Sequence, residues 1–499
     1  MDGPHARPAP VSPSVPAIDR VRAVIARVVP RGAIVLSLLS LGYFAAGIVR
    51  NRVFAAEFGI SAELDAYNAA FRIPEIALDI LVGAGLSAPF VPIFSRLLAG
   101  NRPGATTEEL ERAALEAPLD GADRAQAFGQ SVLTAAVAAI AVALVVLFVA
   151  APWVADTVWS SFDRPTRALY VELVRINCVA QLLFAASMAL GEVLVARRRF
   201  VAYGIAPIVY TSGIVLGAVL LGPSLGIAGA AWGAVAGAAG HLAVRSAGAI
   251  RTGFRIRPRA AFRTAEFREF FRLMLPRMLS YPLDPIIVSY LTVLAAGLGT
   301  GTVSALSFVL DYQFVPVQVI AISFSLAAFP VLSAAWNARD DGGFRRLVVR
   351  NVLTIGGLTA LAAVLLALLA EPLVARLLGG GRFDEQAVSL TAGLLVAFAV
   401  TIPIDSLSYP LSRALYATHN TLWQVLGSLL GLGALVASAQ VFVPALGGAG
   451  IAAAYATGGV VKLVVLGAAL TFRMRSGAEP GAATGPAGDE PSGGTVRAA

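Results

Sequence analysis

The stretch that decides the fold is DAYNAAFRIPEIALDILVGAGLSAPFVPIF, residues 65–94. It has the length and the apolar content of a membrane-spanning helix, yet it contains Asp65, Arg72, Glu75 and Asp79. A charge at the centre of a bilayer costs about 2.5–3.5 kcal/mol even on the most lenient scale. On an α-helix these four side chains fall within about 80° of one another. The pattern therefore predicts one charged face that points away from lipid.

Two interpretations of this face remain. The one we favour is a water-filled, charged cavity, because the face is too long for a single ion pair. Pro74 supports it, since proline opens the backbone of a membrane helix where a cavity can use it. The alternative is a set of internal ion pairs between helices, and Arg72 and Glu75 have the i,i+3 spacing for such a pair.

The composition is that of a membrane protein. Of 499 residues, 57% are hydrophobic and 14% charged, against about 45–50% and about 25% in soluble domains. The net charge of +8 does not indicate nucleic-acid binding, because the arginines are scattered over short loops. The single cysteine, Cys178, excludes an internal disulfide, and no Cys/His spacing of a metal site is present.

Apolar runs of roughly 20 residues or more predict about twelve membrane spans. Their approximate positions are 33–54, 66–95, 129–155, 169–195, 201–222, 225–247, 271–296, 302–334, 350–376, 387–415, 420–442 and 448–471. Arginines gather on alternate loops, which predicts a multi-pass protein of the inner (cytoplasmic) membrane with both termini in the cytoplasm. The proline-rich first residues have no apolar core of a signal peptide.

The chain also repeats itself. PSLGIAGAAWGA (223–234) is similar to PALGGAGIAAAY (444–455), and LFVAAPWVADTVW (147–159) to LALLAEPLVARLL (366–378), both at a spacing of about 220 residues. Two such halves predict an all-α membrane fold of two six-helix parallel repeats around a central cavity, which favours a transporter over a channel. The expected parts are a disordered cytoplasmic tail, an N-terminal lobe, a basic cytoplasmic linker, a C-terminal lobe and a second disordered tail, at 1–30, 31–250, 251–268, 269–473 and 474–499.

Further charges lie within the predicted spans. Arg50, near the end of the first span, is expected in the cavity, whereas for Arg52 the cavity and the membrane interface are equally favoured. Charges beside prolines or deep in the second half are candidates for ion coupling or gating, namely Arg277, Asp284, Asp311 and Asp405. Three other charged or polar residues are expected at the membrane interface, namely Glu192, His241 and Arg245.

This set of residues suits an amphiphile with an anionic head and a long apolar tail. The guanidinium fork matches phosphate, and carboxylates in the membrane can carry a coupling ion, H⁺ or Na⁺. No cofactor is expected beyond that ion. The sequence contains no Walker A loop, no HExxH and no nucleophile elbow, so we predict a transporter and not an enzyme.

Several motifs resemble the MurJ/MviN family of lipid II flippases. Arg50 is followed by LDAY (64–67), FRIPE (71–75) and PFVPIF (89–94), and FVPVQVIAISFSLAAFPVLS (314–333) is similar to the family's second characteristic segment. The resemblance implies the fold of the multidrug/oligosaccharidyl-lipid/polysaccharide exporter superfamily. It also implies a cavity lined by Arg50, Asp65 and Arg72, with the arginines on the substrate diphosphate.

The chain departs from the family pattern at five positions. Where the family carries an arginine or a glutamate, this sequence has Phe44, Leu78, Asp79, Gly83 and Asp311. Two further spans of the family, which extend a groove for the lipid tail, are not expected here.

The function we predict is a lipid II flippase that works by alternating access in cell-wall biogenesis. Its expected partners are a polyprenyl-diphosphate-linked glycan and membrane lipids, and not nucleic acid. One alternative is an exporter of another polyprenyl-linked glycan or a drug. A second is a non-transporting membrane scaffold that recruits cell-wall synthesis proteins through its cytoplasmic arginines.

Overall fold

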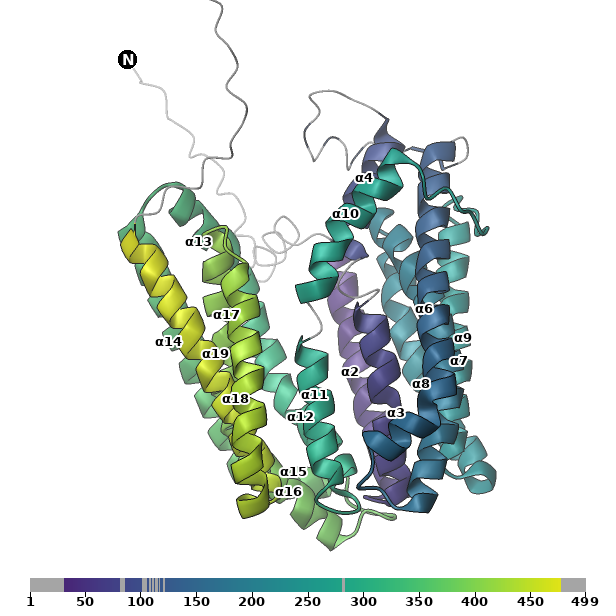
Figure 1. Ribbon diagram of the computed structural model, residues 1–499. Coiled ribbons are helices and arrows are strands. Elements are labelled where there is room, and N and C mark those ends of the chain that lie inside the picture. Colours follow the sequence, from purple (N-terminus) through teal and green to yellow (C-terminus); the bar gives the residue numbers. More distant parts are fainter. Residues whose placement is uncertain are drawn as a thin grey trace, which may run out of the picture. The chain divides into compact units, whose positions relative to one another are not determined.

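The computed structural model describes residues 31–80, 86–100, 122–280 and 283–476, with single residues and one short stretch between 106 and 119. These residues fold almost wholly into α-helices (Figure 1). The two predicted tails fall largely on residues 1–30 and 477–499, which lie outside the described residues, and the last helix extends to Ser476.

The described residues form two compact units. Unit 1 comprises the chain up to Ser304 together with Leu377–Glu385. Its helices are α2 (Arg31–Phe58), α3 (Ala62–Leu78), α4 (Ser87–Ala99), α6 (Asp123–Thr157), α7 (Arg164–Ala196), α8 (Phe200–Leu225), α9 (Ile227–Ile250), α10 (Ala265–Ser280), α11 (Leu283–Ala296) and the first turn of α12 (Thr302–Pro316).

Unit 2 comprises Ala305–Arg376 and the chain from Gln386 onward. It contains most of α12, the π-helical turn η2 (Val317–Ile322), α13 (Ser323–Asn337), α14 (Asp341–Leu368), most of α15 (Ala370–Leu377), most of α16 (Glu385–Ala399), α17 (Thr401–Ala417), α18 (Leu422–Leu446) and α19 (Gly448–Ser476). The units are defined by contacts and not by the repeat, so the lobe boundaries given above stay a prediction.

The number of membrane spans agrees with the sequence. Eight helices, counting Thr302–Asn337 as one, are long and apolar enough to cross a membrane, and α16 with α17 forms a ninth span bent by 41°. Within the described residues, the other expected spans overlap α2, α3 with α4, and α10 with α11, in line with about twelve spans. Within the described residues, the span formed by α16 and α17 is thus built from two helices, and α3 runs through Pro74 to Leu78.

The same helical hairpin occurs in both units and supports the internal repeat. Gly226 joins α8 to α9 at φ +58°, ψ −141°, and Gly447 joins α18 to α19 at φ +57°, ψ −129°. Only glycine adopts this backbone region easily, because a Cβ would clash there. The two glycines lie in the repeated motifs quoted above, so the sequence repeat corresponds to a repeated turn.

Close approach of backbones holds the first of these hairpins together. A Cβ on Gly233 of α9 would lie 2.5 Å from the carbonyl oxygen of Gly213 on α8, and one on Gly217 would lie 2.5 Å from that of Gly229. Lipid tails give helices no hydrophobic reason to associate, so small residues that allow close van der Waals contact supply much of the attraction.

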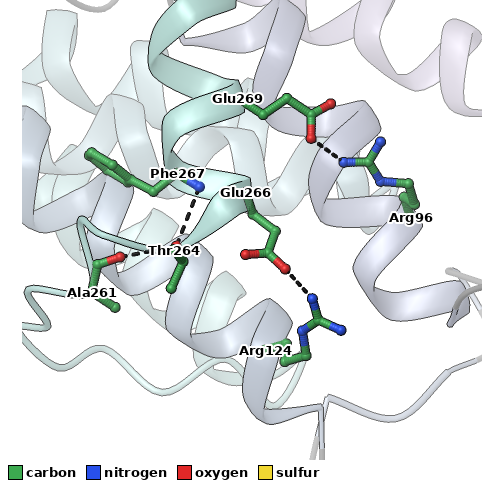
Figure 2. A network of polar contacts seen from close by, with 7 residues as sticks. All are labelled: Arg96, Arg124, Ala261, Thr264, Glu266, Phe267 and Glu269. Carbon is green, nitrogen blue, oxygen red and sulfur yellow. Dashed lines mark hydrogen bonds and ion pairs between the residues drawn. The ribbon is translucent and has the colours of Figure 1, made fainter.

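One end of unit 1 is tied by ring packing and ion pairs. Phe270 of α10 packs edge-on against Phe128 of α6, with ring centroids 5.8 Å apart. Next to these rings, Glu269 pairs with Arg96 of α4 at 2.5 Å, and Glu266 pairs with Arg124 of α6 (Figure 2). Thr264 receives a hydrogen bond from the backbone N–H of Phe267 and so caps the start of α10.

Candidate functional site

Asp65 lies at the start of α3 and is 2% exposed. Its carboxylate accepts hydrogen bonds from the backbone N–H of Gly301 at 2.5 Å, from that of Ser304 at 2.7 Å, and from the Ser304 hydroxyl at 2.5 Å. Gly301 directly precedes α12 and Ser304 lies in its first turn, where helix N–H groups lack partners within their own helix. The carboxylate therefore caps α12, and its negative charge also complements the positive end of the helix dipole.

The other three charges of the stripe lie farther along α3 and keep contact with the surface. Arg72 and Glu75 form an ion pair at 3.9 Å, with side chains 22% and 45% exposed. Asp79, the residue that follows α3, is also half-buried. Asp65 and Asp79 are about 21 Å apart along the helix axis. The stripe thus contains both a buried helix cap and a partly exposed ion pair. A role of these residues in substrate binding remains a prediction.

Arg50 of α2 is partly buried. Its guanidinium donates to the Asn51 side chain at 2.9 and 3.2 Å. Arg50 and Glu75 both lie within electrostatic range of the Tyr67 hydroxyl on α3 and of the Tyr210 hydroxyl on α8. Arg50 and Glu75 thus act on the same two phenol groups of unit 1, and Arg72 is joined to this set through its ion pair with Glu75, whereas Asp65 is not part of it.

The part of α3 next to the charged stripe is packed against neighbouring helices. Tyr67 meets Phe54 of α2 edge-on at 5.2 Å and lies 4.5 Å from Phe71, measured between ring centroids. The Asn177 amide of α7 donates to the carbonyl of Ala70 at 3.4 Å. These contacts fix the position of α3, and with it the backbone that carries Arg72 and Glu75.

Arg52 of α2 lies outside the packed core, and the choice between cavity and membrane interface stays open for it. It is exposed, and its guanidinium donates to the carbonyl of Gly379. Gly379 belongs to Leu377–Glu385, and Arg382 of the same segment donates its backbone N–H to Ala56 at 2.9 Å and lies 3.6 Å from Glu63. The segment Leu377–Glu385, although distant in sequence, therefore contacts the end of α2 and the start of α3, close to Asp65.

The candidates in the second half lie in different settings. Asp405 of α17 is half-buried and accepts a hydrogen bond from the Tyr455 hydroxyl of α19 at 2.6 Å. Asp284 and Asp311 are exposed. The side chain of Arg277 lies outside the described residues. A role of these four in coupling or gating remains a prediction.

Sequence reasoning placed Glu192, His241 and Arg245 at the membrane interface, and this is wrong. All three are buried, with exposures of 4%, 0% and 2%. The His241 ring lies 2.6 Å from the Ser187 hydroxyl through Nδ1, and Arg245 donates to the Ser187 carbonyl at 3.2 Å and covers the Tyr203 ring. His241 and Arg245 are i,i+4 on α9 and both contact α7, where Gly191 leaves room for the guanidinium.

The described residues contain no group of three or more His, Cys, Asp or Glu side chains that could hold a metal ion. The chemistry of the region around Arg50 is that of guanidinium, carboxylate and phenol groups. Guanidinium groups bind phosphate or carboxylate through two parallel hydrogen bonds.

Comparison with known proteins agrees with this architecture. The family model described as lipid II flippase MurJ matches residues 54–484. The chain belongs to the MurJ family. A lipid II flippase MurJ of Burkholderia cenocepacia is 24% identical over 431 residues, covering 84% of this chain and 79% of its own. A probable lipid II flippase MurJ of Rhizobium meliloti is 26% identical over 447 residues, covering 87% and 79%.

Solved structures show the same fold. A lipid II flippase MurJ in an inward closed conformation aligns with a TM-score of 0.72 at 19% identity, covering 88% of this chain and 87% of that one. An inward-facing multidrug transporter of the MATE family aligns at 0.66 and 13% identity, covering 87% and 95%. The predicted MATE-like fold of about twelve spans is confirmed, as are the family and the classification as an inner-membrane transporter and not an enzyme.

Proposed function

We propose that this chain flips lipid II, the lipid-linked precursor of peptidoglycan, across the cytoplasmic membrane by alternating access. The observation that carries the proposal is the pair of partly buried arginines, Arg50 and Arg72, on neighbouring helices of a MurJ-family chain. Buried arginine is costly in a membrane and is kept where it meets an anionic group. The diphosphate that links the lipid to its glycan is such a group, and two guanidinium forks fit it.

The ion pair of Arg72 with Glu75 has a part in this mechanism. At 3.9 Å it is at the long end of ion-pair distances, and with side chains 22% and 45% exposed it is only partly desolvated. A diphosphate offers more acceptor oxygens than one carboxylate, so it can displace Glu75 from Arg72 at small cost. When no substrate is bound, Glu75 neutralises the charge of Arg72.

The arrangement of arginines supports both termini in the cytoplasm, as the positive-inside rule predicts. For coupling, we propose Asp405 as the group that binds H⁺ or Na⁺, because its carboxylate is half-buried and oriented by Tyr455. Cell-wall synthesis proteins remain expected partners only under the scaffold alternative.

The test is rescue of a strain depleted of its own lipid II flippase. Wild type should restore growth, and Arg50→Ala and Arg72→Ala should fail at normal membrane abundance. Arg72→Lys should rescue poorly, since a point charge cannot replace the fork. Arg164→Ala, an exposed arginine at the start of α7, is the matched control and should rescue fully.

Each alternative predicts a different result. A scaffold would rescue growth with Arg50 and Arg72 both replaced by alanine. An exporter of another glycan would not rescue even as wild type, although the protein is abundant in the membrane. One observation favours the exporter of another glycan. The carboxylate of Asp311 is exposed at a position where the family resemblance implies an arginine.

A further inference from the structure

The connection between α9 and α10 is fastened to α6 along much of its length. We call residues 251–264 the basic strap. Gln126 of α6 donates to the carbonyl of Gly253 at 2.7 Å and accepts from the N–H of Arg255 at 3.0 Å, while Gln130 donates to the carbonyl of Arg255 at 2.6 Å. Both glutamines are 5% exposed. Two buried glutamine side chains of a membrane helix thus use their hydrogen-bonding groups to hold this segment in place.

The later part of the basic strap is also attached to α6. The backbone N–H of Arg259 donates to the Thr134 hydroxyl at 3.0 Å, and that of Ala261 donates to the Ser131 hydroxyl at 3.1 Å. Phe254 is 2% exposed, and its ring lies so close to Gly129 that a Cβ there would come within 2.8 Å. A linker that served only to join two helices would need none of these contacts.

The side chains that this backbone presents are basic. The strap's arginines are all exposed, namely Arg251, Arg255, Arg257, Arg259 and Arg263. Within the part of the chain that the structure describes, no carboxylate pairs with Arg257, Arg259 or Arg263. Fixed backbone and exposed, like-charged side chains together make a preformed site for a negatively charged partner.

The depth of the strap in the membrane follows from α6. This helix has 35 residues and is about 52 Å long, against about 30 Å for the hydrocarbon core. Its strongly exposed apolar side chains lie between Val142 and Trp153, which places lipid tails along that part. The strap is attached between Gln126 and Thr134, about 12 Å of helix at the other end. That is the level of the lipid headgroups.

Exposed apolar side chains alternate with the arginines. Ile256 is 39% exposed and Phe262 is 40% exposed. Basic residues mixed with apolar ones are the pattern of a segment that lies in the membrane interface, with cations at the phosphates and apolar groups just below them.

From these observations we propose that the basic strap is a binding site for the headgroups of anionic phospholipids, in the leaflet that the positive-inside rule identifies as cytoplasmic. The site is separate from the Arg50 and Arg72 region and does not depend on the proposed substrate. Its physical role is to fix the end of α6, and through it α10, to the membrane surface.

The test measures lipid binding to the full chain in detergent, by native mass spectrometry with phosphatidylglycerol and phosphatidylcholine as probes. The strap variant is Arg257→Gln, Arg259→Gln and Arg263→Gln together. The matched control removes the same charge from exposed arginines elsewhere, namely Arg339→Gln, Arg345→Gln and Arg346→Gln.

Each arginine near an anionic surface adds about fivefold to binding, so three add about 100-fold. We expect phosphatidylglycerol affinity to fall at least tenfold in the strap variant and less than threefold in the control, with phosphatidylcholine unchanged in both. A smaller fall in the strap variant, or an equal fall in the control, overturns the proposal.

Two further arms separate the built site from charge alone and from free phosphate. Gln126→Met with Gln130→Met keeps every arginine but releases the strap, and should also weaken phosphatidylglycerol binding. If this variant binds as wild type does, the site is not preformed and the proposal fails. It also fails if inorganic pyrophosphate at equal concentration displaces the lipid, since the strap would then bind soluble phosphate.

Discussion

Replacing Asp65 tests whether this carboxylate acts on the helix α12 or on a substrate. Asp65→Ala leaves two backbone N–H groups and the Ser304 hydroxyl without an acceptor at a site that is 2% exposed. An unsatisfied buried donor costs about 1–3 kcal/mol, so the expected loss of stability is about 3–6 kcal/mol after partial relaxation. Asp65→Asn keeps one acceptor oxygen but turns an NH₂ toward a donor, which costs about 2–4 kcal/mol. Ser304→Ala removes one donor and should cost about 1 kcal/mol.

The assay is thermal unfolding of the purified variants, followed by intrinsic fluorescence. The unfolding entropy of a chain this long converts 1 kcal/mol into about 1–2 °C of Tm. The decrease in Tm should therefore be largest for Asp65→Ala, smaller for Asp65→Asn and smallest for Ser304→Ala. The Tm of Ser304→Ala should stay within about 2 °C of wild type.

The same variants distinguish the two roles. A residue that only contacts substrate can be replaced by alanine without loss of stability, whereas a cap cannot. An Asp65→Ala protein with wild-type Tm and no flipping activity would refute the capping argument and restore Asp65 to the substrate site. Removing the cap should also impair transport, because it loosens the first turn of α12, the last part of unit 1 before the chain enters unit 2.

Three other predictions follow from single contacts. A backbone hydrogen bond and, to a smaller extent, the ion pair with Arg124 hold the pKa of Glu266 below the ordinary value of 4.5. The stabilisation is therefore present above pH 4.5 and is lost as the pH falls through the lowered pKa, so Glu266→Gln should flatten the acid side of the Tm–pH curve. Gly233→Ala should prevent close packing of the hairpin and lower the Tm by several degrees, whereas Gly467→Ala, at an open helical position, should be neutral or raise it slightly. Tyr455→Phe removes a hydrogen bond to the Asp405 carboxylate and should cost about 1.5–3 kcal/mol in chemical unfolding, while Asp405→Asn with unchanged ion dependence of flipping would argue against coupling at this residue.

The fold was predictable because it depends on patterns that are local in the chain. Apolar runs of bilayer length identify the spans, and the glycines at 226 and 447 mark the same turn in each half. The bend between α16 and α17 was not predictable, because the apolar run 387–415 continues across it. Hydropathy reports burial in lipid and says little about the continuity of the backbone.

The site was predictable only in part. The helical spacing correctly put Arg72 and Glu75 together, and their contact was the one named in advance. The partners of Asp65 lie 236 and 239 residues away, and no local pattern encodes them. His241 and Arg245 lie near the end of a span, where basic side chains commonly reach the interface, so only the packing of α7 against α9 shows that they are buried.

Charged side chains on one face of a membrane helix indicate that this face does not contact lipid. They can be kept from lipid in two ways. At its start, the stripe of α3 avoids lipid by burying a carboxylate against three donors from the start of another helix. Farther on, it does so by a loose ion pair that remains partly exposed. A buried carboxylate that already accepts three hydrogen bonds is closed to a ligand, whereas the loose pair can exchange its carboxylate for another anion. The recognition chemistry of the stripe is therefore expected at Arg72, and its contribution to the position of α12 at Asp65, seven residues away on the same face.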